Sequence, residues 1–461
     1  MNSLTLCALL LLGGCAITPP AARVAMPAAP QWIAPLPHNG SVTDLAQWWQ
    51  QQGDPLLVRL IEAGQAVSPT VASAASRIGQ ARAVRVSAGA ALAPTLDAAA
   101  SASRSSAQPG VPLGTVAQVA LQASWEIDLF GARRLARDSA QARLDGAQAG
   151  WHDARVSVAA DIANQYYALR ACRQLLDVTS ADATSRSETA RLSQLSANAG
   201  FVAPATAALA RASAAEASSR VTQQQALCDI DVKVLVALTA IAEPDLRQQL
   251  ASTTSSLLLA APIAITSLPA QTLSQRPDVF NAEREVAAAS AAVGTAQAQR
   301  YPRLTLAGSI GAGAFRANGV TTDAPTWTIG PLALSLPVFD GGTRAANVDA
   351  AAAAYDEAVA LYRARVRQAV REVEEALVNL DSTRARSADA GLAVDGYRAS
   401  FAGTESRYRS GLASLVELED ARRLRLAAEL TQVSLQQQRS AAWIALYRAA
   451  GGGWRNPDFK E

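Results

Sequence analysis

Two corner sequences constrain this chain more than any other feature. Residues 125–134 (Trp-Glu-Ile-Asp-Leu-Phe-Gly-Ala-Arg-Arg) end a segment of alternating side chains and begin a very long helical segment. Residues 334–344 (Leu-Ser-Leu-Pro-Val-Phe-Asp-Gly-Gly-Thr-Arg) make the same transition in the second half. A hydrophobic period that changes from 2 to 3.6 at matching points of two halves indicates an internal repeat.

The first half predicts short helices, a β-hairpin and a long helical hairpin. Helices are expected over residues 46–63 and 69–91, and strands over 95–104 and 116–127, joined by a loop rich in glycine and proline. Long helices follow over 132–198 and 205–240. Gly200, with Pro204 just beyond it, marks the turn between them. The first of these helices should extend roughly 100 Å, at 1.5 Å per residue.

The second half predicts the same elements in the same order. A helix is expected over 278–300 and strands over 304–314 and 327–336, with Gly319 and Pro325 in the loop between them. A long helix from 343 then turns at Gly411, and 411 − 200 = 211. The predicted organisation is a signal peptide (1–14), a tether (15–45), two repeats (46–240 and 278–450, with β-hairpins near 95–127 and 303–337), an equatorial linker between them (241–277) and a tail (451–461).

Composition argues against several classes of function. The 41 basic residues are scattered and nearly balanced by 39 acidic ones, so nucleic acid is not expected as a partner. The two histidines, His38 and His152, are far apart in sequence and have no cysteine nearby, so neither a metal site nor a catalytic base is expected. The glycines of residues 308–313 do not follow the dinucleotide-binding order. No catalytic residue and no cofactor is predicted, apart from a covalent lipid.

That lipid is predicted on Cys15. The apolar run before it ends in Leu-Gly-Gly-Cys, which resembles a bacterial lipobox, where cleavage precedes a cysteine that then receives acyl chains. The run is too short to span a bilayer as a helix, and no Lys or Arg precedes Arg23. An ordinary signal peptide with an incidental cysteine is the alternative. Ala16, rather than Asp, after the cysteine favours the outer membrane.

Four strands cannot close a membrane barrel, since the smallest known barrels use about eight. Three copies supply 3 × 4 = 12 strands, so the sequence predicts a trimer. The long helices carry charges throughout and exceed a bilayer core of about 30 Å, so they are expected to project into water. The fold class predicted is therefore an α+β membrane protein, a trimeric twelve-stranded β-barrel continued by an α-helical barrel. A soluble helical scaffold with two separate hairpins is the alternative.

The chain resembles the TolC-like outer-membrane factors, and within them the OprM/NodT-type lipoproteins of tripartite resistance-nodulation-division (RND) efflux pumps. The resemblance covers nearly the whole chain. Its motifs, in order, are residues 125–131, residues 273–284 with Arg276-Pro277-Asp278, Gly330-Pro331, residues 336–342 and Gly451-Gly452-Gly453-Trp454. It implies a homotrimer with a twelve-stranded barrel, a helical barrel and an equatorial collar. It also implies a periplasmic adaptor protein and an inner-membrane RND transporter as partners.

The resemblance places a periplasmic gate at the second helical turn. Tyr408, Asp420 and Arg423 match family residues that hold the tips closed, and Val416 stands where a bulkier leucine is usual. Three carboxylates, Glu417, Glu419 and Asp420, could also form a ring that attracts cations. The alternative is that these charges lie on solvated helix faces.

The spacing of two cysteines predicts a disulfide. Cys172 lies 28 residues before Gly200 and Cys228 lies 28 after it, so an antiparallel helical hairpin brings them level. The periplasm is oxidising, which favours a bond between them. Two independent buried cysteines are the alternative, and a Cα separation above about 7 Å excludes the bond.

The predicted function is a passive outer-membrane exit duct of an RND-type efflux pump, which exports drugs or other small toxic compounds. One alternative is the exit duct of another exporter, such as a type I secretion system. A second, of a different class, is a periplasmic structural lipoprotein without a pore.

Overall fold

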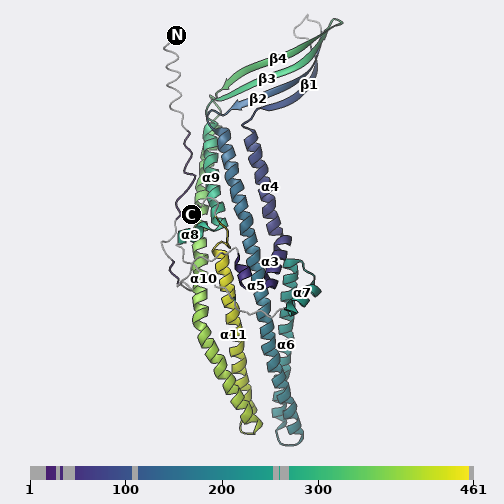
Figure 1. Cartoon of the computed structure of the whole chain (residues 1–461), viewed down its shortest axis with the longest axis vertical. Helices are drawn as coiled ribbons and strands as arrows, with labels where there is room; N and C mark the ends of the chain where they lie inside the picture. Colours follow the sequence, from purple (N-terminus) through teal and green to yellow (C-terminus); the bar gives the residue numbers. More distant parts are fainter. Residues whose placement is uncertain are drawn as a thin grey trace. The chain divides into compact units, whose positions relative to one another are not determined.

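The computed structural model describes residues 17–26, 32–34, 47–105, 113–252, 259 and 269–455. The chain is mostly helical and carries one four-stranded sheet (Figure 1). It divides into two compact units. Unit 1 comprises Met1–Ala25, Ala75–Ala149 and Phe280–Ala364, and includes the sheet; unit 2 comprises Met26–Ala74, Gly150–Val279 and Arg365–Glu461.

The sheet is an antiparallel meander in the order β1-β2-β3-β4 (Thr95–Ser105, Gly114–Ile127, Arg303–Ala317 and Val320–Ser335). Strands from both halves of the sequence therefore pair, β2 with β3, which leaves β1 and β4 at the edges. Strand β4 begins seven residues before the predicted strand and contains Pro325, which the sequence assigns to a loop. Proline is tolerated there because β4 is an edge strand, where a missing N–H need not interrupt a ladder.

Two long helical hairpins follow the strands. Hairpin 1 consists of α5 (Ala132–Asn198) and α6 (Pro204–Thr239), and hairpin 2 of α10 (Thr343–Arg409) and α11 (Leu415–Ala449). Helices α5 and α10 contain 67 residues each. Among the described helices, none combines the length and the apolar character that a transmembrane helix needs.

Both corner sequences begin their helix with an aspartate. The Asp128 carboxylate accepts hydrogen bonds of 3.0 Å from the backbone N–H groups of Arg133 and Arg134 at the start of α5. Asp340 accepts hydrogen bonds from the N–H groups of Gly342, just before α10, and Arg344, in its first turn. A carboxylate at a helix N-terminus satisfies N–H groups that lack a partner within the helix. This shared cap explains why the two corners carry similar residues.

The first short helix of the sequence prediction is wrong in its extent. The structure has two helices there, α2 (Trp48–Gln51) and α3 (Pro55–Val67), followed by α4 (Pro69–Ala90). Local interactions cause the interruption between α2 and α3. Asp54 accepts hydrogen bonds from the N–H groups of Leu56 and Leu57, and Pro55 occupies the first helical position. Asp54 therefore begins a new helix where hydrophobic spacing alone suggests a continuous one.

The predicted linker (residues 241–277) and the predicted tether (residues 15–45) are only partly described. The linker contains α7 (Glu243–Ala251) and α8 (Pro269–Ser274), and α9 (Pro277–Ala298) follows. Residues 17–25 of the tether belong to unit 1, where Ser290 Oγ donates to the Pro20 carbonyl and Arg23 pairs with Glu283 at 3.5 Å. Cys15 and residues 1–14 lie outside the described residues.

The Arg276-Pro277-Asp278 motif ties together distant parts of unit 2. Arg276 is 5% exposed, donates to both carboxylate oxygens of Asp278 (3.0 and 2.8 Å), and reaches Glu372 of α10 (2.7 Å) and the Ala449 carbonyl of α11 (3.1 Å). Burial opposes the charge of Arg276, but the bonds to Asp278 and Glu372 outweigh it and raise the pKa. The motif is thus a structural anchor between α9 and hairpin 2.

Candidate functional site

The tips of the two helical hairpins are closed by matching turns. Gly200 and Gly411 have φ of 80° and 72°, a left-handed conformation that glycine adopts without strain. The next residue in each turn donates its N–H to a carbonyl five residues earlier, Phe201 to Ser196 at 2.9 Å and Leu412 to Arg407 at 2.8 Å. The apolar side chains of Phe201 and Leu412 are 86% and 71% exposed, so each tip presents an uncovered apolar residue.

Helix α11 starts with a capping box just after the second turn. Ser414 Oγ accepts from the Glu417 N–H at 3.2 Å, and the Glu417 carboxylate accepts from the Ser414 N–H at 2.7 Å. These hydrogen bonds, together with Arg407, lower the pKa of Glu417. Glu417 is therefore occupied in ending the turn and starting the helix.

A buried polar cluster joins the two hairpins near the tips. We call it the inter-hairpin cluster; its members are Asp182, Ser185, Arg186 and Thr189 of α5, Ser213 of α6, and Glu419, Arg422 and Arg425 of α11. Arg186 pairs with Asp182 on its own helix at 2.8 Å and with Glu419 on the other hairpin. Ser213 Oγ donates to the same Glu419 carboxylate at 2.8 Å. Glu419 therefore receives donors from both helices of hairpin 1.

Arg422 is the second link within the cluster. Its side chain is 1% exposed, pairs with Glu419 at 2.8 Å, and donates to Thr189 Oγ1 at 2.6 Å and to the Ser185 hydroxyl at 3.0 Å. The Arg425 guanidinium lies 4.0 Å from the ring centre of Phe401 on α10, a cation–π contact within hairpin 2. Three buried polar atoms of the cluster, Asp182 Oδ1, Arg422 Nε and Arg425 Nε, have no hydrogen-bond partner among the described residues. Its charged groups are nevertheless paired across the two hairpins, and a paired buried charge holds its partner in one arrangement. The cluster thus fixes hairpin 2 against hairpin 1 within one chain.

The gate residues that the resemblance implies occupy two different environments. Tyr408 lies between the hairpins, with its hydroxyl 3.2 Å from Ser193 Oγ of α5. Asp420 and Arg423 pair with each other at 2.7 Å within α11 and are 63% and 72% exposed. Val416 is 66% exposed, and the spacing of 416, 420 and 423 places these three on one side of α11. Of these four residues, only Tyr408 contacts the other hairpin through a hydrogen bond among the described residues.

The inter-hairpin cluster is the part of the site that sequence reasoning missed. Of the three carboxylates considered for a cation-attracting ring, Glu419 belongs to the cluster, Glu417 to the capping box and Asp420 to an exposed pair. The available signal was Asp182 and Arg186 at i and i+4 beside apolar positions of α5. Their partners on α11 lie more than 200 residues away, which no local pattern reveals.

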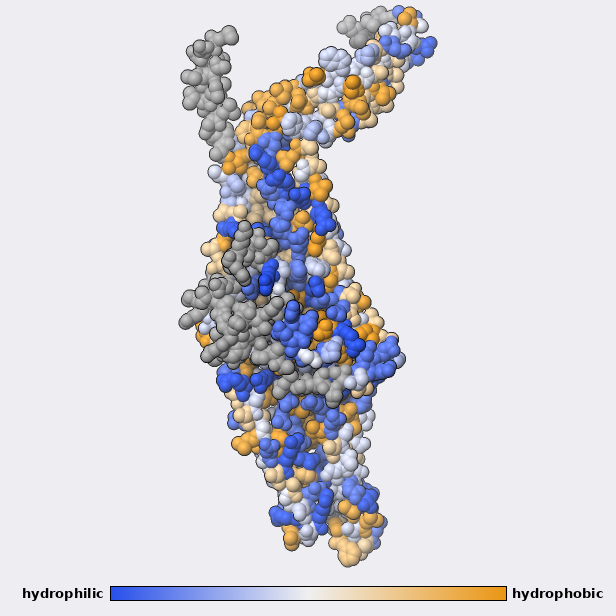
Figure 2. Space-filling model, viewed as in Figure 1, coloured by the Kyte–Doolittle hydropathy of each residue, from blue (hydrophilic) through white to orange (hydrophobic). Residues whose placement is uncertain are grey.

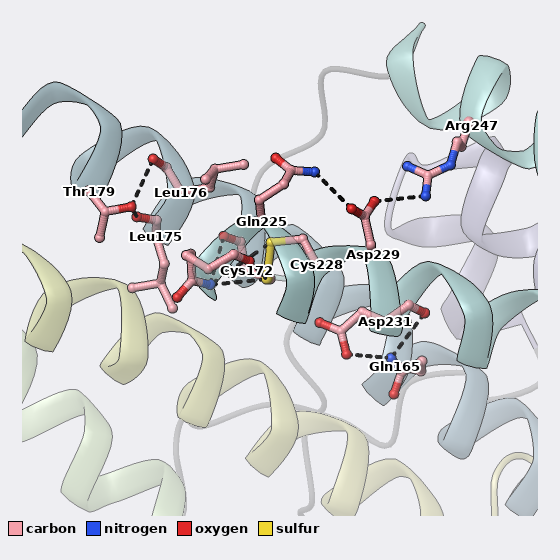
Figure 3. Close-up of a disulfide and its surroundings, with 11 residues drawn as sticks. Gln165, Cys172, Leu175, Leu176, Thr179, Gln225, Cys228, Asp229, Asp231 and Arg247 are labelled. Carbon is pink, nitrogen blue, oxygen red and sulfur yellow. Dashed lines mark hydrogen bonds and ion pairs between the residues drawn. A yellow bond between two sulfur atoms is a disulfide. The ribbon is translucent and has the colours of Figure 1, made fainter. Parts of the chain in front are cut away.

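A disulfide braces hairpin 1 (Figure 3). Cys172 of α5 and Cys228 of α6, the two residues that the sequence pairs, are bonded with their Cα atoms 5.5 Å apart. Gln165 of α5 donates to the Asp231 carboxylate of α6 at 2.9 Å, and Arg247 of α7 reaches Asp229 at 2.8 Å. Covalent and polar links thus hold α6 to both α5 and α7.

The sheet forms a second surface with two unlike faces. One row across the strands is Asp97–Gln122–Ser309–Thr328, and the next is Ala98–Leu121–Ile310–Trp327. Because side chains alternate along each strand, these rows lie on opposite faces. The apolar face exposes large side chains by 45% to 88%: Leu96, Val119, Leu121, Ile310, Trp327, Ile329, Leu332 and Leu334. Hydrophobic residues cover much of the strands in Figure 2, and hydrophilic ones gather at the hairpin-turn end.

The comparisons with known proteins agree with this arrangement. A family model described as outer membrane efflux protein matches residues 60–240 and 268–452. The chain is 29% identical to the solvent efflux pump outer membrane protein SrpC of Pseudomonas putida, over 98% of both chains. It is 30% identical to the pyoverdine export outer membrane protein OpmQ of Pseudomonas aeruginosa, covering 97% of this chain and 96% of that one.

Solved structures give the same result. The outer-membrane channel OprN superposes with a TM-score of 0.83 at 28% identity, covering 95% of this chain and all of that one. The two segments of the family match each contain one helical hairpin and one pair of strands. The chain therefore belongs to the outer membrane efflux protein family, as an outer-membrane protein that acts in efflux.

Proposed function

We propose that three copies of this chain form a passive exit duct, in which twelve strands close a transmembrane β-barrel and the helices continue it as a tube in the periplasm. The observation that carries the proposal is the two-faced sheet with two open edges. Strand β1 of one copy would pair with β4 of the next, since an unpaired edge of this length otherwise invites aggregation. The apolar face then meets lipid and the polar face lines the lumen.

The exposed side of α11 fits a gate made between copies. Val416, Asp420 and Arg423 share that side, and within one chain the two charges have only each other as partners among the described residues. In a trimer, the same side of α11 faces a neighbouring helix around the narrow end of the tube. Ion pairs between copies then hold the tips together, while the inter-hairpin cluster keeps each copy rigid. Opening separates the copies at Asp420 and Arg423.

The duct belongs to a tripartite pump. The exposed apolar tips, Phe201 and Leu412, are suited to contact a periplasmic adaptor protein, which connects the duct to an inner-membrane RND transporter. Cleavage after residue 14 and acylation of Cys15 would anchor each copy in the outer membrane. The relatives are named for solvent efflux and pyoverdine export, so we propose small, toxic or secreted compounds as cargo.

Single-channel conductance in planar bilayers tests the duct and the gate. The purified protein should conduct weakly, and the Asp420→Ala/Arg423→Ala variant should conduct several times more. The matched control is Asp381→Ala/Arg384→Ala, an exposed pair of the same i, i+3 spacing and the same 2.7 Å separation on α10. This control should conduct like the wild type, because it removes one ion pair away from the tips.

Other results lead to other functions. Weak conductance that neither pair of substitutions changes places the gate elsewhere. No conductance and no trimer by chemical cross-linking would favour the structural lipoprotein without a pore. A conducting trimer that is co-purified with a secretion ATPase, rather than an RND transporter, would favour the type I secretion duct.

A further inference from the structure

A groove lies on the apolar face of the sheet, near the hairpin turns. Its volume is about 760 Å³, and its lining includes two complete rows of that face. The rows are Ala100–Val119–Ala312–Pro325 and Ala102–Ala117–Ala314–Asp323. Five of these eight side chains are alanines, so the groove is shallow-walled and apolar. A flexible hydrocarbon chain fits such a surface better than a bulky polar group does.

The next row toward the turns is cationic. It reads Arg104–Thr115–Arg316–Thr321, on the same face as the groove. Both arginines are exposed, and neither forms an ion pair or hydrogen bond with another described residue. Strands β1 and β3 are separated only by β2, so the two backbones are about 10 Å apart. Two long guanidinium side chains at that spacing can converge on one anionic group, with Thr115 between them.

The direction of the chain places this row toward the outer leaflet. The strands meet the helices at one end, at Thr95, Ile127, Arg303 and Ser335. The hairpin turns lie at the opposite end of the strands. Because the helices are periplasmic, the arginine row lies where the apolar band meets the outer surface. From the helix end to the hairpin-turn end of this face, the side chains thus change from large aliphatic ones, through alanines in the groove, to arginine and threonine.

We propose that this surface binds a phosphorylated lipid of the outer leaflet, with an acyl chain in the groove and a phosphate between Arg104 and Arg316. Arginine is suited to phosphate because its planar guanidinium can donate two hydrogen bonds at once. The site rests on the proposed function, since it requires the apolar face to contact lipid. Charge complementarity selects the occupant: a neutral lipid would leave both guanidinium groups unpaired at the membrane surface.

Asp323 provides a second test, in which a substitution is expected to strengthen lipid binding. It is exposed at the rim of the groove, one row from Arg316 and on the neighbouring strand β4. A carboxylate at that position repels a phosphate held by Arg316. Removal of its charge should therefore strengthen binding, whereas removal of either arginine should weaken it. Nonspecific partitioning of lipid onto the apolar face predicts neither change.

Native mass spectrometry of the purified full-length protein in detergent provides the measurement. The probe is a synthetic bis-phosphorylated glucosamine disaccharide that carries acyl chains, and the comparison lipid is the same molecule without phosphates. Arg104→Gln/Arg316→Gln should weaken binding of the probe roughly 30-fold, because each arginine near an anionic surface contributes about fivefold. Asp323→Asn should strengthen it. Arg303→Gln is the matched control, because Arg303 is exposed on β3 at the opposite end and on the polar face.

The outcomes separate this site from the duct itself. Equal binding of the probe by the wild type and the double variant, or equal binding of the two lipids, would overturn the lipid site. Displacement of the probe by inorganic phosphate at equal concentration would overturn the role of the groove. Conductance of the same preparations is recorded in parallel. A protein that conducts but shows no arginine-dependent lipid binding would contradict the lipid site and not the duct. A protein that binds the lipid through the arginines but does not conduct would contradict the duct and not the lipid site.

Discussion

Arg422 Nη2 lies 2.6 Å from Thr189 Oγ1, so a guanidinium on α11 is held by a hydroxyl on α5. The adjacent residue, Arg423, is 72% exposed, and its one ion-pair partner among the described residues is Asp420 of the same helix. Neighbouring arginines of one helix therefore have separate tasks. Arg422 joins the two hairpins within a chain, and Arg423 is available at the surface.

Substitution of these two arginines should affect stability very differently. Arg422→Gln leaves the Glu419 carboxylate with one fewer cation in a buried setting, so the free energy of unfolding should fall by roughly 3–5 kcal/mol. Arg423→Gln should cost about 1 kcal/mol or less, as exposed pairs do. Thermal unfolding followed by circular dichroism compares them directly. Similar losses for the two variants would contradict a specific role for the cluster.

Two glycines of α10 and its turn should respond in opposite directions to alanine. Gly411→Ala places a side chain on a residue with φ of 72° and should destabilise the second tip by about 1–2 kcal/mol. Gly403→Ala lies within the exposed helix, where no atom is within 4 Å of an added Cβ, and should stabilise it by about 0.5–1 kcal/mol. Guanidinium unfolding curves of both variants test the signs. A stabilising Gly411→Ala would show that the turn is not strained by a side chain.

Loss of the disulfide should weaken hairpin 1. The bond closes a segment with a sequence separation of 56, and the chain-entropy model assigns such a loop about 4 kcal/mol of stabilisation. Cys172→Ser/Cys228→Ser should therefore lower the melting temperature. Reductant should lower the melting temperature of the wild type to that of the variant and leave the variant unchanged. A variant that still responds to reductant would locate the sensitive bond elsewhere.

Two aspartates near Arg276 should give opposite pH dependence. Burial, together with Asp278, raises the pKa of Asp153, so ionised Asp153 weakens the fold at pH values above its folded pKa. Asp153→Asn should therefore raise the melting temperature at pH 7, and the gain should vanish as the pH approaches about 4.

The ionised form of Asp278 stabilises the fold, in contrast to that of Asp153. Burial disfavours its charge, but Arg276 outweighs this and lowers its pKa, so its stabilisation is complete above the unfolded pKa of about 4 and is lost below it. Asp278→Asn should destabilise the protein by a constant amount between pH 5 and 8. Melting curves from about pH 3 to 8 separate the two residues by the sign of the effect, a gain for Asp153→Asn and a loss for Asp278→Asn, each of which shrinks as the pH falls to about 4 or below. Effects of the same sign for the two variants at pH 7 would contradict the assignment.

The change of hydrophobic period from 2 to 3.6 at the two corner sequences carries most of the information that the sequence holds about the fold. The corner residues predict where strands end and long helices begin, because Asp128 and Asp340 cap helices through local hydrogen bonds. Local sequence signals do not predict secondary structure where the pairing with other strands determines it. Pro325 suggests a loop, but it lies within β4 opposite Ala312 of β3, and no local sequence pattern predicts that pairing.

The candidate site, like the fold, could be predicted from the sequence only where local geometry determines it. The turns at Gly200 and Gly411 and the Cys172–Cys228 pairing follow from spacing along a hairpin, which is a local geometry. The inter-hairpin cluster depends on the register of α5 against α11, which long-range packing sets. The resemblance supplied Tyr408, Asp420 and Arg423; the structure places Tyr408 between the hairpins and the other two in an exposed pair on α11.

The open edges of the sheet also bear on how the protein reaches its membrane. A single chain carries edge strands β1 and β4 and exposes a broad aliphatic face; the face favours lipid over water, and the unpaired edge groups are costly in lipid. If three copies close the barrel as proposed, insertion and closure of the ring become one event, and its rate depends steeply on how many chains are present at once. Biogenesis would be limited by encounter between newly exported chains, and a scarce chain would be degraded before it could insert.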